Sequence, residues 1–131
     1  MNREIKFRGQ KQTNGVWVYG SLVYSNELDA AIYFQRGNGS VKVMDWVYVK
    51  PETVGQFTSL YDKDGKEIYE GDILKVQGTR ERIEVRFVRG VFAFLWNGNL
   101  DDEAPINAPT QEWAEVIGNI HDNPKLLNRK K

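Results

Sequence analysis

The chain of 131 residues contains no cysteine and only one histidine, His121. The absence of cysteine excludes disulfide bonds, thiolate nucleophiles and structural zinc sites held by sulfur. A single histidine gives little support to a catalytic triad or a histidine-rich metal site. A role as general base is conceivable for His121, but we interpret it as a surface or packing residue.

The sequence also lacks net charge and long apolar runs. Its 18 basic and 18 acidic side chains cancel, so no global field attracts nucleic acid or an anionic membrane. No apolar stretch is long enough for a signal peptide or a membrane span, and we expect a cytoplasmic protein. No glycine-rich phosphate loop or dinucleotide fingerprint occurs, so we expect no cofactor.

Aromatic residues are plentiful, with six Phe, six Tyr and four Trp, and the apolar pattern has mostly a period of two. Short strands separated by Gly, Asn and Asp turns predict a mainly β fold with little helix. We expect hairpins, with a bent sheet or an SH3-like small barrel in the C-terminal half. Residues 1–131 are of single-domain length, with a possible subdivision near 51–66 between an N-terminal β layer and the small barrel.

The strongest element prediction is a hairpin over residues 82–96. With Arg89-Gly90 as its turn, the apolar residues fall opposite one another as Phe87 and Phe92, Val85 and Phe94, and Ile83 and Trp96. A slip of one residue would break all three pairs. A bulged three-residue loop is the alternative to the two-residue turn.

Other segments are predicted with less detail. Residues 4–24 indicate a hairpin around Asn14-Gly15. Further along, Val41, Val43, Val47 and Val49 share one face of a strand, on which Asp45 is the odd member, and residues 52–66 are mostly irregular. Residues 122–127 indicate a helical turn that begins near a proline.

One basic concentration could contact nucleic acid or another partner. It consists of Arg80, Arg82, Arg86 and Arg89. Neighbouring Trp and Phe residues would suit a nucleic-acid backbone and its bases. Glu81 and Glu84 interleave with these arginines, and a salt-bridged outer face of the sheet is the alternative interpretation.

Two acids flank a glycine at Glu70-Gly71-Asp72. On a regular strand both carboxylates would point the same way, as a magnesium site or an acid–base pair requires. The alternative is that Gly71 bends the chain and Asp72 accepts hydrogen bonds from nearby amides, and we favour it. Residues 62–66 do not match a calcium-binding loop and indicate a turn, and we interpret the acidic run 101–103 as a solvated loop.

Four motifs in order resemble the YopX family of phage and prophage proteins: REIKFR at 3–8, VKPETVGQFT at 49–58, DKDGKEIYEGDI at 62–73 and VIGNIHDNP at 116–124. The chain departs from the family's frequent Ala-Trp after the first motif, having Gly9-Gln10 there. The resemblance implies a phage or prophage origin and a mainly β fold, but no established activity and no catalytic residues. Within these motifs Gly55, Gly65, Gly71, Asp72 and Gly118 have the character of a structural signature.

Together these features favour a non-enzymatic accessory protein that binds a host or phage macromolecule. Self-association through exposed strand edges is a further expectation. The two alternatives are a nucleic-acid-binding protein that uses a small β-barrel, and a metal-dependent enzyme that uses Glu70 and Asp72.

Overall fold

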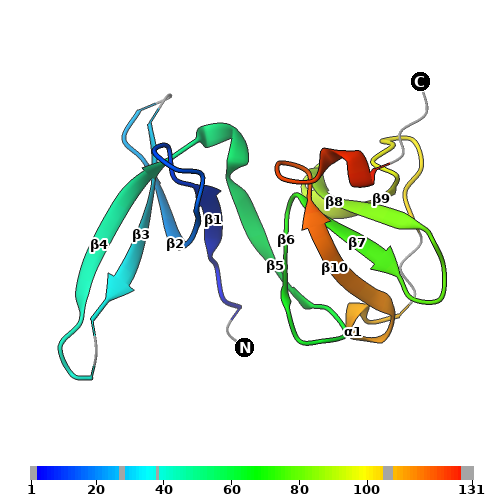
Figure 1. Cartoon of the computed structure of the whole chain (residues 1–131), viewed down its shortest axis with the longest axis horizontal. Helices are drawn as coiled ribbons and strands as arrows, with labels where there is room; N and C mark the ends of the chain where they lie inside the picture. Colours follow the sequence, from blue (N-terminus) through cyan, green and yellow to red (C-terminus); the bar gives the residue numbers. More distant parts are fainter. Residues whose placement is uncertain (1–2, 27–28, 38, 105–107, 128–131) are drawn as a thin grey trace. The chain divides into compact units, whose positions relative to one another are not determined.

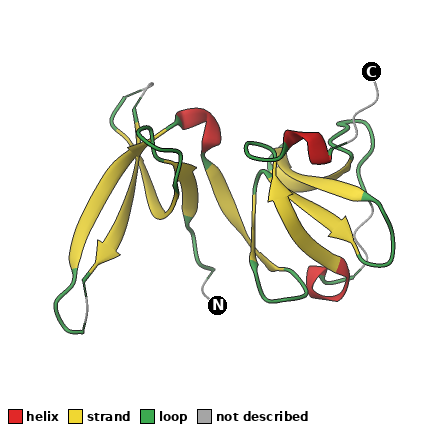
Figure 2. Ribbon diagram, in the orientation of Figure 1, coloured by secondary structure: helices red, strands yellow, loops and turns green. Residues whose placement is uncertain are grey.

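The computed structural model describes residues 3–26, 29–37, 39–104 and 108–127. These residues form two antiparallel sheets with only short helical segments (Figure 2), so the prediction of a mainly β fold with little helix is confirmed. The chain divides into two compact units, Met1–Phe57 and Thr58–Lys131. Strand β5 (Gly55–Tyr61) runs across this boundary. No helix in the described ranges is both long enough and apolar enough to span a membrane.

The first unit contains four complete strands, the start of β5 and one helical turn. The strands are β1 (Phe7–Gln10), β2 (Trp17–Tyr24), β3 (Ala30–Arg36) and β4 (Val43–Val49), and the turn is η1 (Pro51–Thr53). The strand order is β4-β3-β2-β1-β5 (Figure 1). Strands β1 to β4 are therefore neighbours in chain order, and β5 pairs with the other side of β1. The predicted hairpin of residues 4–24 is confirmed, with Gln10 opposite Trp17 and Gly15 at φ 73°.

The sheet of the first unit is strongly curved. The end of β1 approaches the end of β4, where Lys11 and Val49 form a bridge and the Lys50 amide donates to the Gln10 carbonyl at 2.8 Å. Two glycines permit this curvature. A Cβ at Gly9 would lie 2.9 Å from the Val49 side chain, and a Cβ at Gly20 would lie 2.0 Å from a backbone oxygen.

The core of the first unit lies on one face of this sheet. Ala30, Ile32 and Val49 are fully buried there. The residues packed around them are Phe7, Val18, Leu22, Val47 and Val54. The predicted valine face is therefore the core face of β4 at Val47 and Val49. Val41 lies before the strand, and both Val41 and Val43 remain exposed.

The second unit holds a four-stranded sheet in the order β10-β7-β8-β9 (Figure 1). Its strands are β7 (Asp72–Val76), β8 (Arg82–Val88), β9 (Val91–Trp96) and β10 (Ala114–Asn119), and the short β6 (Glu67–Tyr69) pairs with β5. The predicted register of the 82–96 hairpin is confirmed, with Ile83 opposite Trp96. Arg89 and Gly90 both have positive φ, as a two-residue turn of type I′ requires.

The core of the second unit is built from residues of β6 to β10. It consists of Ile68, Leu74, Ile83, Val85, Phe94 and Ala114. The two helical pieces are α1 (Thr110–Trp113) and η2 (Pro124–Leu126). The latter confirms a helical turn with proline at its start.

One expectation needs correction, and one alternative is decided. Residues 52–66 are not mostly irregular, because η1 and the seven residues of β5 lie there. A half-buried strand alternates buried and exposed side chains, and β5 breaks this alternation because the neighbours Phe57 and Thr58 are both buried. The strands of the described residues form no closed barrel, so the open-sheet alternative holds for the C-terminal half.

Candidate functional site

The first sheet carries a row of aromatic side chains on the face opposite its core. Directly opposed residues on neighbouring strands point to the same face, and Tyr33 of β3 lies opposite Trp46 of β4. Alternation along each strand adds further residues to this face. The aromatic face, as we define it, consists of Trp17, Tyr19, Tyr33, Met44, Trp46 and Tyr48.

The rings at the centre of the aromatic face contact one another. Tyr33 and Trp46 stack with centroids 6.0 Å apart and an interplanar angle of 25°. Trp46 and Tyr48 meet edge to face, with centroids 4.9 Å apart. These contacts restrict the rings, yet Trp46 and Tyr48 keep 44% and 43% of their surface exposed. The face therefore offers preordered aromatic surface to a partner.

Its periphery contains further exposed apolar atoms. Tyr19 is 46% exposed and Met44 is 59% exposed. At the β1 end, the guanidinium of the buried Arg8 lies 4.6 Å from the centre of the Trp17 ring. Monomeric proteins rarely expose large contiguous apolar patches unless these mark an interaction site, and Tyr, Trp and Met are enriched at interfaces.

The charged side chain of β4 lies on the face opposite the aromatic face. Asp45 points to the core side and forms an ion pair with Arg36, Nε to Oδ2, at 3.2 Å. Its Oδ1 accepts a hydrogen bond from the Trp46 amide at 2.8 Å. In the described strands β1 to β4 no acidic residue falls on the aromatic face.

The four predicted contact arginines lie in the second unit, and three of them have protein partners. Arg86 forms two hydrogen bonds with the buried carboxylate of Glu84, at 2.7 and 3.0 Å. Arg89 pairs with Glu103 of the acidic run. Arg82 donates to the Leu126 carbonyl at 3.3 Å, whereas Arg80 is exposed in the loop before β8. The arrangement agrees more closely with the salt-bridged face than with a continuous basic surface.

Gly71 and Asp72 form a bend that joins β6 to β7. Gly71 has φ 95°, and its amide donates to the Val85 carbonyl at 2.7 Å. The buried Asp72 carboxylate accepts the Tyr69 amide at 2.7 Å. Glu70 is only half-buried. The two acids therefore differ in environment, and Asp72 serves the backbone of its own bend.

The other signature glycines occupy three kinds of position. Gly55 is buried at the start of β5, opposite Arg8 of β1. Gly65 has φ 80° in the turn before β6. At Gly118 a Cβ would lie 2.5 Å from Asn123 Oδ1, so close packing of the following loop requires glycine there.

The buried carboxylate of Asp62 organises the turn before β6. Sequence reasoning did not single out this residue. Its Oδ1 accepts the amides of Asp64 and Lys66, and its Oδ2 accepts the Val116 amide, each at 2.9 Å. Burial raises the pKa of Asp62, but these three backbone hydrogen bonds and the charge of Lys66 outweigh it, leaving the pKa below its usual value. Asp62 is thus an ionised structural group that ties the turn to β10.

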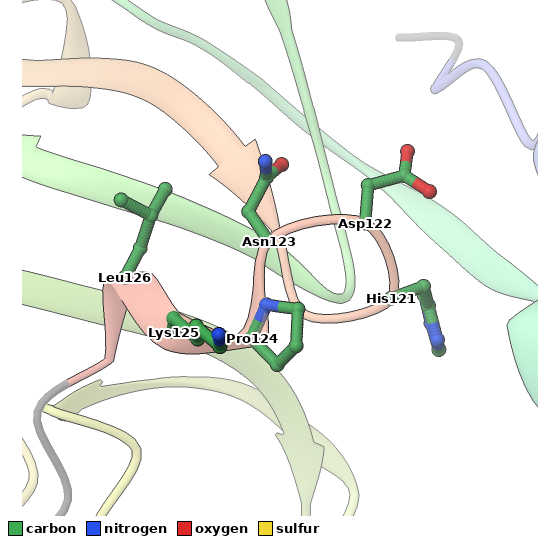
Figure 3. Close-up of a pocket in the computed structure, with 6 residues that line it drawn as sticks. All are labelled: His121, Asp122, Asn123, Pro124, Lys125 and Leu126. Carbon is green, nitrogen blue, oxygen red and sulfur yellow. The ribbon is translucent and has the colours of Figure 1, made fainter.

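A shallow surface depression follows β10, lined by residues 121–126 (Figure 3). The side chain of Asn119 holds this loop by accepting the amides of His121 and Asp122, both at 2.9 Å. The lining side chains spread around the loop and do not converge on one point. Among the described residues, no group of three or more His, Cys, Asp or Glu could hold a metal ion.

Sequence reasoning missed the aromatic face, although the signal was present. Met44, Trp46 and Tyr48 alternate with the valines that were predicted to share one face of a strand. A strand with apolar residues on both sides is typical of a fully buried position. In the structure, however, Met44, Trp46 and Tyr48 on the second apolar face of β4 remain exposed.

Comparisons with known proteins find a matching family and similar solved structures. The family model described as YopX protein matches residues 6–128. The structure titled crystal structure of protein EF1440 from Enterococcus faecalis is similar, with a TM-score of 0.63 and 21% identity, over 97% of this chain and 100% of that chain. At this identity the similarity shows the fold alone. No curated protein matches the chain.

Proposed function

Because the chain belongs to the YopX family, whose model spans residues 6–128, we propose that it is an accessory protein encoded by a phage or prophage. It works in the host cytoplasm by binding a macromolecule of the host or the phage, and it catalyses no reaction. The signature residues support this reading, because Gly71, Asp72 and Gly118 serve bends and close packing.

The aromatic face of the first sheet is the observation that carries the proposal. Trp46 and Tyr48 are held by ring contacts but remain substantially exposed. Because few rotamers are left to these rings, a partner would order them at little cost in conformational entropy. Large aromatic anchors of this kind dominate the free energy of binding at interfaces.

The two alternative functions have less support. The guanidinium groups of Arg86 and Arg89 are engaged by Glu84 and Glu103, which reduces the positive potential that nucleic acid would meet there. A metal-dependent reaction would need the Asp72 carboxylate, which already accepts the Tyr69 amide. Thermal stability that rises with Mg²⁺ or Mn²⁺ would support the metal alternative.

The test is an affinity pull-down from phage-infected host cells with three forms of the tagged protein. Wild type and Phe87→Ala are expected to retain the same specific partner, and Trp46→Ala is expected to lose it. Phe87 is the matched control, because it is a 49% exposed aromatic residue on the second unit. Circular dichroism confirms that each variant is folded. Equal recovery of all partners by Trp46→Ala and wild type would exclude the aromatic face as the binding surface.

A further inference from the structure

Basic residues flank the aromatic face on β4. Met44, Trp46 and Tyr48 occupy its even-numbered positions, and the same series has Lys42 before the strand and Lys50 after it. Lys42 is exposed and Lys50 is half-buried. Along this row, three large apolar side chains are therefore flanked by a lysine at each end.

Within strands β1 to β4 no acidic residue belongs to this row, and Asp29, which precedes β3, accepts a hydrogen bond from the Asn26 side chain at 2.8 Å. The one acid of β4, Asp45, points to the other face and is engaged by Arg36. Residues 1–57 contain seven basic and five acidic side chains, while the whole chain is neutral. The first unit thus has a small excess of positive charge, and the lysines at the two ends of the row are the groups that can approach an anion.

We propose, building on the proposed function, that the aromatic face binds single-stranded nucleic acid. Unpaired bases stack on the rings of Trp46 and Tyr48, and the backbone phosphates lie near Lys42 and Lys50. Binding of single strands by proteins combines these two elements, a stacking platform and flanking positive charge. Duplexes are disfavoured, because their bases are already stacked and cannot reach a sheet face.

The dimensions of the row fit a short single strand. Strand residues rise about 3.3 Å each, so Lys42 and Lys50 lie roughly 26 Å apart along β4. Such a length suits the lower end of the roughly 4–16 nucleotides that small β domains cover. Stacking accepts any base, so we expect little sequence preference.

The binding test uses fluorescence anisotropy of labelled single strands of about 15 nucleotides. Oligothymidine, oligouridine and a DNA duplex of equal length are compared with the full-length protein at low salt. Both single strands are expected to bind more tightly than the duplex, and the tighter of the two identifies DNA or RNA as the preferred ligand. Failure of both single strands to bind at low salt, or duplex binding of equal strength, would overturn the proposal.

Variants then locate the site. Trp46→Ala is expected to weaken single-strand binding about ten-fold, while Phe87→Ala leaves it unchanged. Should Trp46→Ala fail to fold, the double variant Lys42→Ala/Lys50→Ala provides the second measurement. It is expected to make the slope of log K against log salt shallower by about 1.4, as loss of two phosphate contacts requires. Unchanged slope and affinity in the double variant would overturn the inference.

The result is separable from the proposed function. A protein partner that is lost from Trp46→Ala in the pull-down, with no single-strand binding in solution, would refute nucleic acid as the ligand and retain the aromatic face as a binding surface. If Trp46→Ala retained both the pull-down partner and single-strand binding, the aromatic face would be refuted as a binding surface and so would the nucleic-acid inference.

Discussion

At the scale of single residues, Gly20 shows how one missing side chain permits the curvature of the first sheet. An added Cβ would lie 2.0 Å from the Tyr33 carbonyl oxygen, which belongs to the backbone of β3 and cannot move alone. We expect Gly20→Ala to lower the free energy of unfolding by about 1–3 kcal/mol, as in other overpacked sites. Chemical denaturation measures this loss. The neighbouring exposed Ser21→Ala is the control and should change stability little; equal stability of the two variants would contradict the close approach.

Asp62 provides a second residue-scale prediction. Asp62→Asn removes a charged acceptor from three backbone amides, and we expect a loss of about 1.5–3 kcal/mol at pH 7. The folded-state pKa of Asp62 is lowered, so its stabilising contribution is complete above the unfolded pKa of about 3.9 and disappears as pH falls through the folded value. The difference between wild type and Asp62→Asn should therefore shrink below about pH 4.

Denaturation curves at several pH values test this dependence. Asp64→Asn is the matched control, because the exposed Asp64 carboxylate pairs only at the surface with Lys63, at 3.3 Å. Such exposed pairs contribute about 0–1 kcal/mol. A stability difference for Asp62→Asn that is the same at pH 3 and pH 7 would show that charge is not the cause.

At the scale of elements, β4 illustrates how an edge strand is protected. The Tyr48 carbonyl and Lys50 amide point away from β3, since they bond to Gln12 and Gln10. Because backbone groups alternate in direction along a strand, the Trp46 amide also points outward. It donates to the Asp45 carboxylate at 2.8 Å, which removes a donor that a further strand would need.

Replacing this carboxylate should expose the edge. We expect Asp45→Ala to self-associate more strongly than wild type, with a concentration-dependent rise in mass measured by light scattering. Arg36→Ala is the control, because it removes the same ion pair but leaves the Asp45 carboxylate to bond to the Trp46 amide. Equal association of both variants would assign the effect to the ion pair.

The same elements show what sequence patterns can and cannot predict. The 82–96 hairpin was predictable because three apolar pairs and a turn glycine all require one register. Strand β5 was not, because its alternation is broken where Phe57 and Thr58 are both buried. The aromatic face was missed because exposure of the second side of β4 depends on whether another layer of the fold packs on it. No local pattern in the sequence reveals this.

At the scale of the whole molecule, the two units have separate cores and opposite charge balance. Ile32 lies in the core of the first unit and Ile83 in that of the second. Residues 58–131 carry eleven basic and thirteen acidic side chains, against seven and five in residues 1–57. A unit with its own core can open on its own, and we expect the two units to unfold as separate cooperative blocks.

Native-state hydrogen exchange tests this expectation with one core variant in each unit. Ile32→Ala and Ile83→Ala should each cost about 2–5 kcal/mol in the block that contains the cavity. Exchange should therefore accelerate in β2 and β3 for the first variant and in β7 and β8 for the second, with little change in the other block. The amides of β5 are the most informative, because the strand spans the boundary and belongs by its first residues to one block and by its last to the other. Equal acceleration across both blocks in either variant would mean that β5 couples them into one cooperative domain.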